Sequence, residues 1–113
     1  MPEDPSLMIV MSTAPEHVAY DIGHALVNEH LVACINLIPV RSMYIWEENF
    51  CTERELLMMM KTTPEKFSEI ENRIRTLHPY DVPEILGVPV SQGTESYLAW
   101  VLQSVSEPPG GRD

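Results

Sequence analysis

The fold is decided by residues 55–78, ELLMMMKTTPEKFSEIENRIRTLH, where an apolar run passes into a helix with one apolar side. The five consecutive apolar residues Leu56–Met60 are typical of a buried strand. After Pro64, which suits a first helical turn, apolar residues recur at spacings of three, four and three: Phe67, Ile70, Ile74 and Leu77. The segment therefore predicts a strand followed by a helix, which Pro79 ends because the residue before proline avoids the helical region.

Charged residues on the predicted helices indicate possible ion pairs and one exception to an apolar stripe. In the helix of residues 64–78, Glu69–Arg73 and Glu71–Arg75 have the spacing of i,i+4 ion pairs. In the helix predicted at residues 15–30, Glu29 is the only polar residue on the apolar stripe.

The same strand and helix patterns recur on both sides of this segment. They predict a strand at 7–11, a helix at 15–30, a long strand at 31–48 with Pro39 at an edge or bulge, a turn at 48–53, a strand at 82–90 and a last helix at 94–105. This order predicts an α+β fold, a ferredoxin-like βαββαβ two-layer sandwich with an extra C-terminal helix. We expect one domain at residues 7–105, with flexible tails at 1–6 and 106–113.

Length and charge exclude several classes of function. A chain of 113 residues suits one domain, and its 7 basic and 17 acidic residues give a net charge of −10. This charge opposes binding to nucleic acid or to anionic membranes, whereas it permits binding of cations. The start MPEDPS is not a basic targeting segment, and two cysteines are too few for a disulfide scaffold. We therefore predict a cytoplasmic protein.

Apolar residues on both faces of the predicted strands indicate self-association. In a two-layer sandwich the sheet face opposite the helices meets water. However, 7–11 and 56–60 are each apolar throughout, so alternation sends half of their side chains to that face. One short C-terminal helix is too small to cover three strands. The sequence therefore predicts a homo-oligomer in which sheets pack on one another.

Several segments in this order resemble the CutA divalent-cation tolerance family: STAPE, LVACINLIP, SMYIWEE, ELLMMMKTT, LHPYDVPEILGVPV and YLAWV. The resemblance covers about residues 7–105. It implies a ferredoxin-like homotrimer similar in architecture to the nitrogen-regulatory PII proteins. It also implies a cytoplasmic protein that is linked to tolerance of copper and other divalent metals, with copper binding and no established catalysis.

The first candidate site lies where the second long helix ends. His78 and Glu84, with Tyr80 and Asp81 between them, supply an imidazole, a phenol and two carboxylates. Imidazole suits copper and zinc, and carboxylates add oxygen ligands, so His78 and Glu84 are the predicted metal ligands. The alternative stays open that His78 only neutralises a helix end and that Tyr80 packs at an interface. We expect Glu84 to enter a strand, where a carboxylate near the core needs a partner.

Sulfur-containing side chains provide weaker candidate ligands. Met11 stands where the resemblance implies a cysteine ligand in some family members, and a thioether suits Cu(I) better than divalent ions. Cys34 fits a small buried residue, although family members share it. Cys51 lies among glutamates, which disfavour a reactive thiolate. The MMM run places its side chains on two faces and so predicts packing rather than a sulfur cluster.

A second candidate site is a cleft between subunits. Lys61 ends an apolar strand face and needs a carboxylate or an anion as its partner. Resemblance to PII-like trimers suggests that Lys61, Tyr80 and Trp46 line a ligand cleft with Glu84. A third group, His17, Asp21 and His24, shares the polar side of the first helix and is typical of a solvated surface.

The sequence leaves two functions open. The first is a trimeric tolerance protein that binds copper or another divalent cation, requires no cofactor and catalyses no reaction. The alternative is a PII-like signalling or scaffold trimer that binds a small ligand or an unidentified protein partner at subunit clefts. An enzyme is disfavoured, because the STAPEH segment lacks an anion-binding arginine and no nucleophile has an evident base.

Overall fold

The computed structural model describes residues 7–106. The predicted N-terminal tail at 1–6, and the predicted C-terminal tail beyond residue 106, lie outside the described residues. The elements in order are β1 (Leu7–Ala14), α1 (Glu16–Asn28), β2 (Cys34–Trp46), β3 (Asn49–Thr62), the 3-10 turn η1 (Pro64–Lys66), α2 (Phe67–Leu77), β4 (Leu86–Val90) and α3 (Glu95–Ser106). Ser106, expected to begin the C-terminal tail, is thus the last residue of α3. The predicted order of strands and helices is confirmed.

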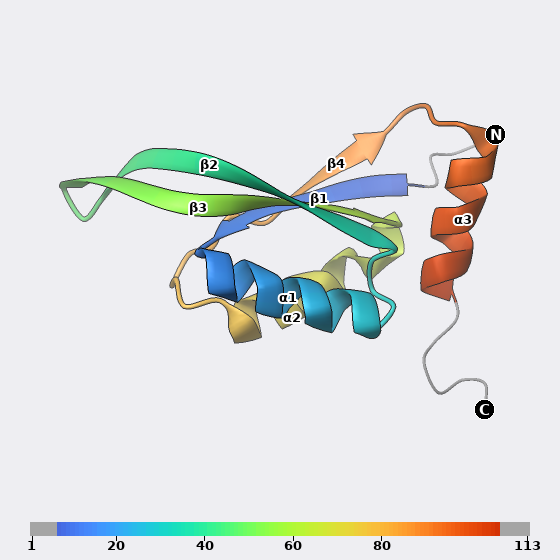
Figure 1. Cartoon of the computed structure of the whole chain (residues 1–113), viewed down its shortest axis with the longest axis horizontal. Helices are drawn as coiled ribbons and strands as arrows, with labels where there is room; N and C mark the ends of the chain where they lie inside the picture. The colour runs from blue at the N-terminus through green and yellow to red at the C-terminus, as the bar shows by residue number, and fades with distance from the viewer. Residues whose placement is uncertain (1–6, 107–113) are drawn as a thin grey trace.

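All four strands belong to one antiparallel sheet in the order β2-β3-β1-β4 (Figure 1). The helices α1 and α2 lie together on one face of this sheet, as right-handed crossovers require. Pro39 lies in β2 at one edge of the sheet, and Pro89 lies in β4 at the other. Both positions agree with the confinement of proline to edge strands, where a missing N–H is tolerated.

The core lies between the sheet and the two helices. Alternate residues of β1 and β3 meet the apolar sides of α1 and α2 in this layer. Met58 and Met60 are fully buried there, whereas Met59 is half-buried on the opposite face of the sheet. The predicted division of the MMM run between two faces is therefore confirmed.

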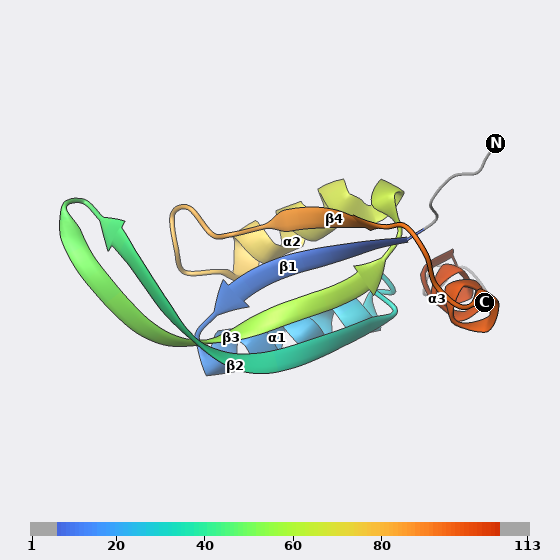
Figure 2. The same ribbon diagram turned by 90° about the horizontal axis from the view of Figure 1, so that it is seen from above.

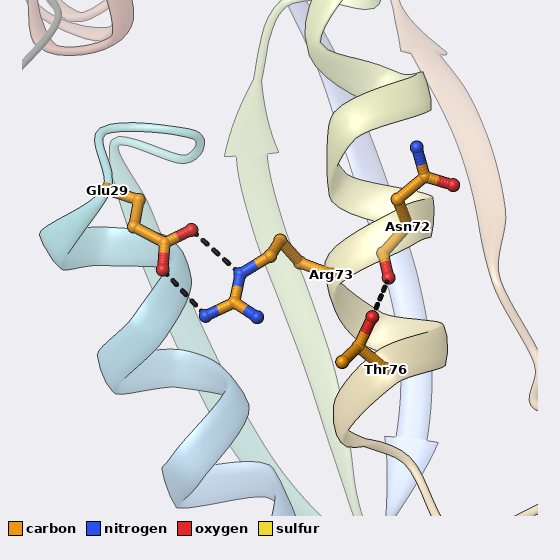
Figure 3. A network of polar contacts seen from close by, with 4 residues as sticks. All are labelled: Glu29, Asn72, Arg73 and Thr76. Atoms are coloured by element: carbon orange, nitrogen blue, oxygen red, sulfur yellow. Dashed lines mark hydrogen bonds and ion pairs between the residues drawn. The ribbon is translucent and has the colours of Figure 1, made fainter.

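One ion pair joins the two helices at the surface of this layer (Figure 3). The Arg73 guanidinium donates two hydrogen bonds to the Glu29 carboxylate, from Nε at 2.9 Å and from Nη2 at 2.7 Å. Arg73 therefore pairs across the helices and not with Glu69, whereas the expected Glu71–Arg75 pair is present at 3.2 Å. The pairing lowers the pKa of Glu29, mainly through the hydrogen bond from Arg73. Since both partners are over one-third exposed, we expect this pair to add less than about 1 kcal/mol.

The hairpin of β2 and β3 extends beyond the rest of the sheet (Figure 2). Residues 40–55 form this extension, here called the hairpin arm, in which β3 pairs only with β2. The chain reverses at Glu47 and Glu48, whose φ angles are 51° and 71°. The predicted turn at 48–53 is therefore wrong, since β3 already begins at Asn49. A turn with two positive φ angles usually contains asparagine or glycine, so the two glutamates did not indicate a turn at this position.

The outer face of the sheet, opposite α1 and α2, keeps exposed apolar residues. The helix α3 lies at one end of the sheet, with Val101 and Val105 buried (Figure 2). Leu86 is 53 % exposed and Val88 is 43 % exposed, while Ile9 is half-buried. The expectation that α3 leaves much of an apolar face uncovered is confirmed. Within residues 7–106, no helix has the length and apolarity needed to cross a membrane.

Candidate functional site

A hollow lies between the hairpin arm and the loop that precedes β4. It has a volume of about 740 Å³ and is here called the arm cavity. Most of its lining comes from three parts of the chain: Ser42, Tyr44 and Trp46 of β2, Cys51, Glu53 and Glu55 of β3, and Tyr80, Asp81 and Glu84 of the loop. Strand alternation explains the first two sets, because every second residue of the arm faces the same side.

A buried carboxylate, that of Glu55, lies at the inner end of the arm cavity. Glu55 is only 5 % exposed. One oxygen accepts a hydrogen bond from Ser42 Oγ at 2.7 Å, and the other accepts one from Tyr80 Oη at 2.6 Å. These two donors satisfy a buried charge that would otherwise be costly. Glu55 thereby holds the loop against the hairpin arm.

Tyr80 is held in place by three contacts. Its hydroxyl group binds Glu55, its backbone N–H donates to His78 Nδ1 at 3.2 Å, and its ring lies 4.6 Å from the His78 ring, centroid to centroid. Burial, followed by the hydrogen bond to Glu55, raises the pKa of Tyr80 well above its usual range. The Tyr80 phenol therefore stays protonated and can donate to Glu55 at all physiological pH values.

His78 is buried behind Tyr80 and uses both ring nitrogens internally. Nε2 lies 2.7 Å from the carbonyl oxygen of Thr13, to which it donates a hydrogen bond, and Nδ1 accepts the Tyr80 N–H. His78 also ends α2 in an extended conformation, with φ −86° and ψ 136°, as expected before Pro79. In this arrangement a metal ion could reach His78 only by displacing one of these two hydrogen bonds.

Glu84 and Asp81 are exposed on the loop and line the arm cavity. The predicted strand at 82–90 begins only at Leu86, so Glu84 is a loop residue and does not enter the core as expected. The carboxylate of Glu84 is therefore free to meet a ligand from solvent.

The other predicted site residues lie elsewhere. Met11 faces the outer side of the sheet between Met59 and Leu86. Cys34 lies beside Tyr97 of α3, where burial and the Cys34 thiol raise the pKa of Tyr97.

Lys61 does not line the arm cavity with Tyr80 and Trp46. Instead, its ammonium group binds the side-chain oxygen of Asn36. His17, Asp21 and His24 are exposed on α1. In residues 7–106, no group of three or more histidine, cysteine or acidic side chains is arranged to hold a metal ion.

Sequence reasoning missed Ser42, Tyr44, Glu53 and Glu55 as members of a site. The alternation of Ser42, Tyr44 and Trp46 indicates a common face. However, one must know the register Tyr44↔Cys51 to see which residues of β3 lie opposite these three residues. The misplaced turn concealed that register.

Comparison with known proteins agrees with this fold. Residues 7–104 match the family model of the CutA1 divalent ion tolerance protein. The divalent-cation tolerance protein CutA of Thermus thermophilus is 41 % identical over 98 residues, which are 85 % of this chain and 95 % of that protein.

Two solved structures are also similar. The periplasmic divalent cation tolerance protein CutA of Archaeoglobus fulgidus is 31 % identical with a TM-score of 0.86, over 88 % of this chain and 99 % of that one. The PII-like protein CutA of Nostoc sp. PCC 7120 is 34 % identical with a TM-score of 0.82, over 87 % of this chain and 96 % of that one. These names describe tolerance to divalent cations or a PII-like protein, and none describes a reaction. The chain belongs to the CutA1 divalent ion tolerance family.

Proposed function

We propose that the protein binds divalent cations, copper foremost, and supports cellular tolerance to them without catalysing a reaction. The observation that carries this proposal is the arm cavity. In the part of the chain that the structure describes, four carboxylates and no lysine or arginine line this cavity, and the chain belongs to a cation tolerance family. Carboxylates in a cavity without basic residues favour positively charged ligands.

The ligands for the cation differ in how readily they are available. Glu84 is exposed beside Asp81 and provides oxygen ligands directly. His78 is the candidate nitrogen ligand and has to exchange a hydrogen bond for the metal ion. His78, Met11 and Cys34 all lie outside the lining of the arm cavity. Met11 and Cys34 are the weaker candidates, because soft sulfur ligands favour Cu(I) over Cu²⁺. Carboxylate with imidazole is a ligand set that suits Cu²⁺.

A copper titration tests this proposal. We expect calorimetry of the full chain with CuCl₂ to show saturable binding that is weakened about tenfold or more by Glu84→Gln or His78→Ala. A tenfold change corresponds to one lost ligand at about 1.4 kcal/mol. Glu65→Gln removes an exposed carboxylate outside the arm cavity and serves as the matched control. Equal weakening in the control, or binding that neither ligand variant changes, would show only general attraction to an acidic surface.

We also propose that the protein is a cytoplasmic homotrimer. The exposed apolar residues Leu86, Val88 and Ile38 on the outer face support self-association, and the resemblance to PII-like trimers suggests the number three. We expect light scattering at micromolar concentration to give three times the chain mass of 12.8 kDa. A stable monomer would contradict the trimer.

A further inference from the structure

We propose that the arm cavity binds a small organic ammonium cation between its aromatic side chains and its carboxylates. This ligand class goes beyond the proposed metal function, because it depends on Tyr44 and Trp46, which are not metal ligands. Three observations carry the proposal: the size of the cavity, its charge and its aromatic lining.

The size of the arm cavity suits a small molecule. Its volume of about 740 Å³ lies within the range of roughly 300–1,000 Å³ that is typical of ligand sites. A hydrated metal ion is far smaller than this space. The walls come from two strands of the hairpin arm and from the loop of residues 79–84, so the fold itself forms the cavity.

The charge of the arm cavity requires a cationic ligand. Among the described residues, its lining includes Glu53, Glu55, Asp81 and Glu84 and no basic residue. Glu55 is nearly fully buried, and both of its hydrogen-bond donors, Ser42 and Tyr80, are neutral hydroxyl groups. Among residues 7–106 this buried carboxylate therefore has hydrogen bonds but no ion pair, although Arg41 and Arg54 line a second hollow with it. A cation in the cavity would compensate this charge.

The aromatic lining selects an organic cation over a metal ion. Tyr44, Trp46 and Tyr80 line the same cavity as the four carboxylates. Aromatic faces attract ammonium and quaternary ammonium groups, which are large and weakly hydrated, by cation–π interaction. Burial, with Cys51 and Glu53 nearby, raises the pKa of Tyr44, so its ring remains neutral at physiological pH. Aromatic and acidic side chains together thus match a cation that has an apolar surface.

Tryptophan fluorescence provides a direct test with choline as the probe. The chain has two tryptophans, so Trp100→Phe leaves Trp46 as the single reporter inside the cavity. We expect choline to change this fluorescence saturably. The neutral isostere 3,3-dimethylbutan-1-ol has the same shape and no charge, so it should bind at least about tenfold more weakly. Equal binding of the two probes, or no saturable change with choline, would overturn the proposal.

Variants separate this site from a general acidic effect and from metal binding. In the Trp100→Phe chain, Tyr44→Leu and Glu53→Gln should each weaken choline binding about fivefold or more. The matched controls Tyr20→Leu and Glu65→Gln remove an exposed ring and an exposed carboxylate outside the cavity and should leave it unchanged. If the controls weaken binding equally, the proposal fails.

The copper titration distinguishes the two proposals. Choline binding without copper binding would remove the proposed metal function and leave this inference intact. Copper binding without choline binding would overturn this inference and leave the proposed metal function intact.

Discussion

Replacing Ile74 with alanine is expected to lower the free energy of unfolding by about 2–5 kcal/mol, the usual range for truncation of a fully buried isoleucine. Ile74 is fully buried on α2 in the layer between the helices and the sheet. Its truncation removes apolar contact and leaves a cavity that a packed layer cannot close. Urea unfolding followed by circular dichroism measures the change, with the protein concentration held constant because the proposed assembly would contribute to stability.

Two comparisons make this prediction specific. Ile74→Val removes a single methylene group and should cost only about 0.5–1.5 kcal/mol. Val27→Ala shortens a residue of α1 that is 40 % exposed and should cost less than the core variant by at least about 1 kcal/mol. An Ile74→Ala protein as stable as Val27→Ala would contradict the described core.

Replacing Tyr80 with phenylalanine is expected to lower the free energy of unfolding by about 1.5–3 kcal/mol at neutral pH, the usual range for a hydrogen bond to a charged group. The substitution keeps the ring beside His78 and removes only the hydroxyl group that donates to Glu55. The buried carboxylate then keeps Ser42 as its remaining side-chain donor. Urea unfolding at pH 7.5 measures the loss, and Tyr20→Phe, at an exposed tyrosine of α1, is the matched control.

The effect of Tyr80 also depends on pH in a defined direction. Folding raises the pKa of Tyr80 above its usual value near 10, first through burial and then through Glu55. Above pH 10 the unfolded chain therefore loses a proton that the folded chain keeps, so stability falls as the pH rises. The Tyr80→Phe chain lacks this titrating group. The difference in free energy of unfolding between the native chain and this variant should therefore shrink between pH 10 and 11. A deficit that is constant over this range would contradict the described contact.

The periodic segments were predictable because local spacing alone determines which side of an element is apolar. The spacing of Ile70 and Ile74 predicted the buried side of α2, and Pro79 predicted an end at His78, one residue beyond the observed end at Leu77. Five apolar residues in β3 predicted a strand buried from both sides, and Leu57 and Met59 do face the outer side of the sheet. Each of these inferences requires only the geometry of one helix or strand.

The site was less predictable, because its members come together through strand register. His78, Tyr80, Asp81 and Glu84 were found as neighbours in the chain, but Glu55 reaches Tyr80 across 25 residues. The turn at Glu47 and Glu48 has no sequence cue of its own, and one shifted residue would move Tyr44 and Glu53 to the other face. The arm cavity could therefore not be assembled from the sequence.

The sequence by itself determined the order of the elements, their apolar faces, the acidic charge and the family. Only the tertiary structure decided which charged groups meet. Arg73 bonds to Glu29 of another helix, although Glu69 has the spacing of a partner on its own helix. The tertiary structure also decided that both ring nitrogens of His78 form hydrogen bonds, while Glu84 remains exposed to solvent. The physical reason is that periodicity acts within one element, whereas hydrogen bonds and cavities depend on distances between elements that packing sets.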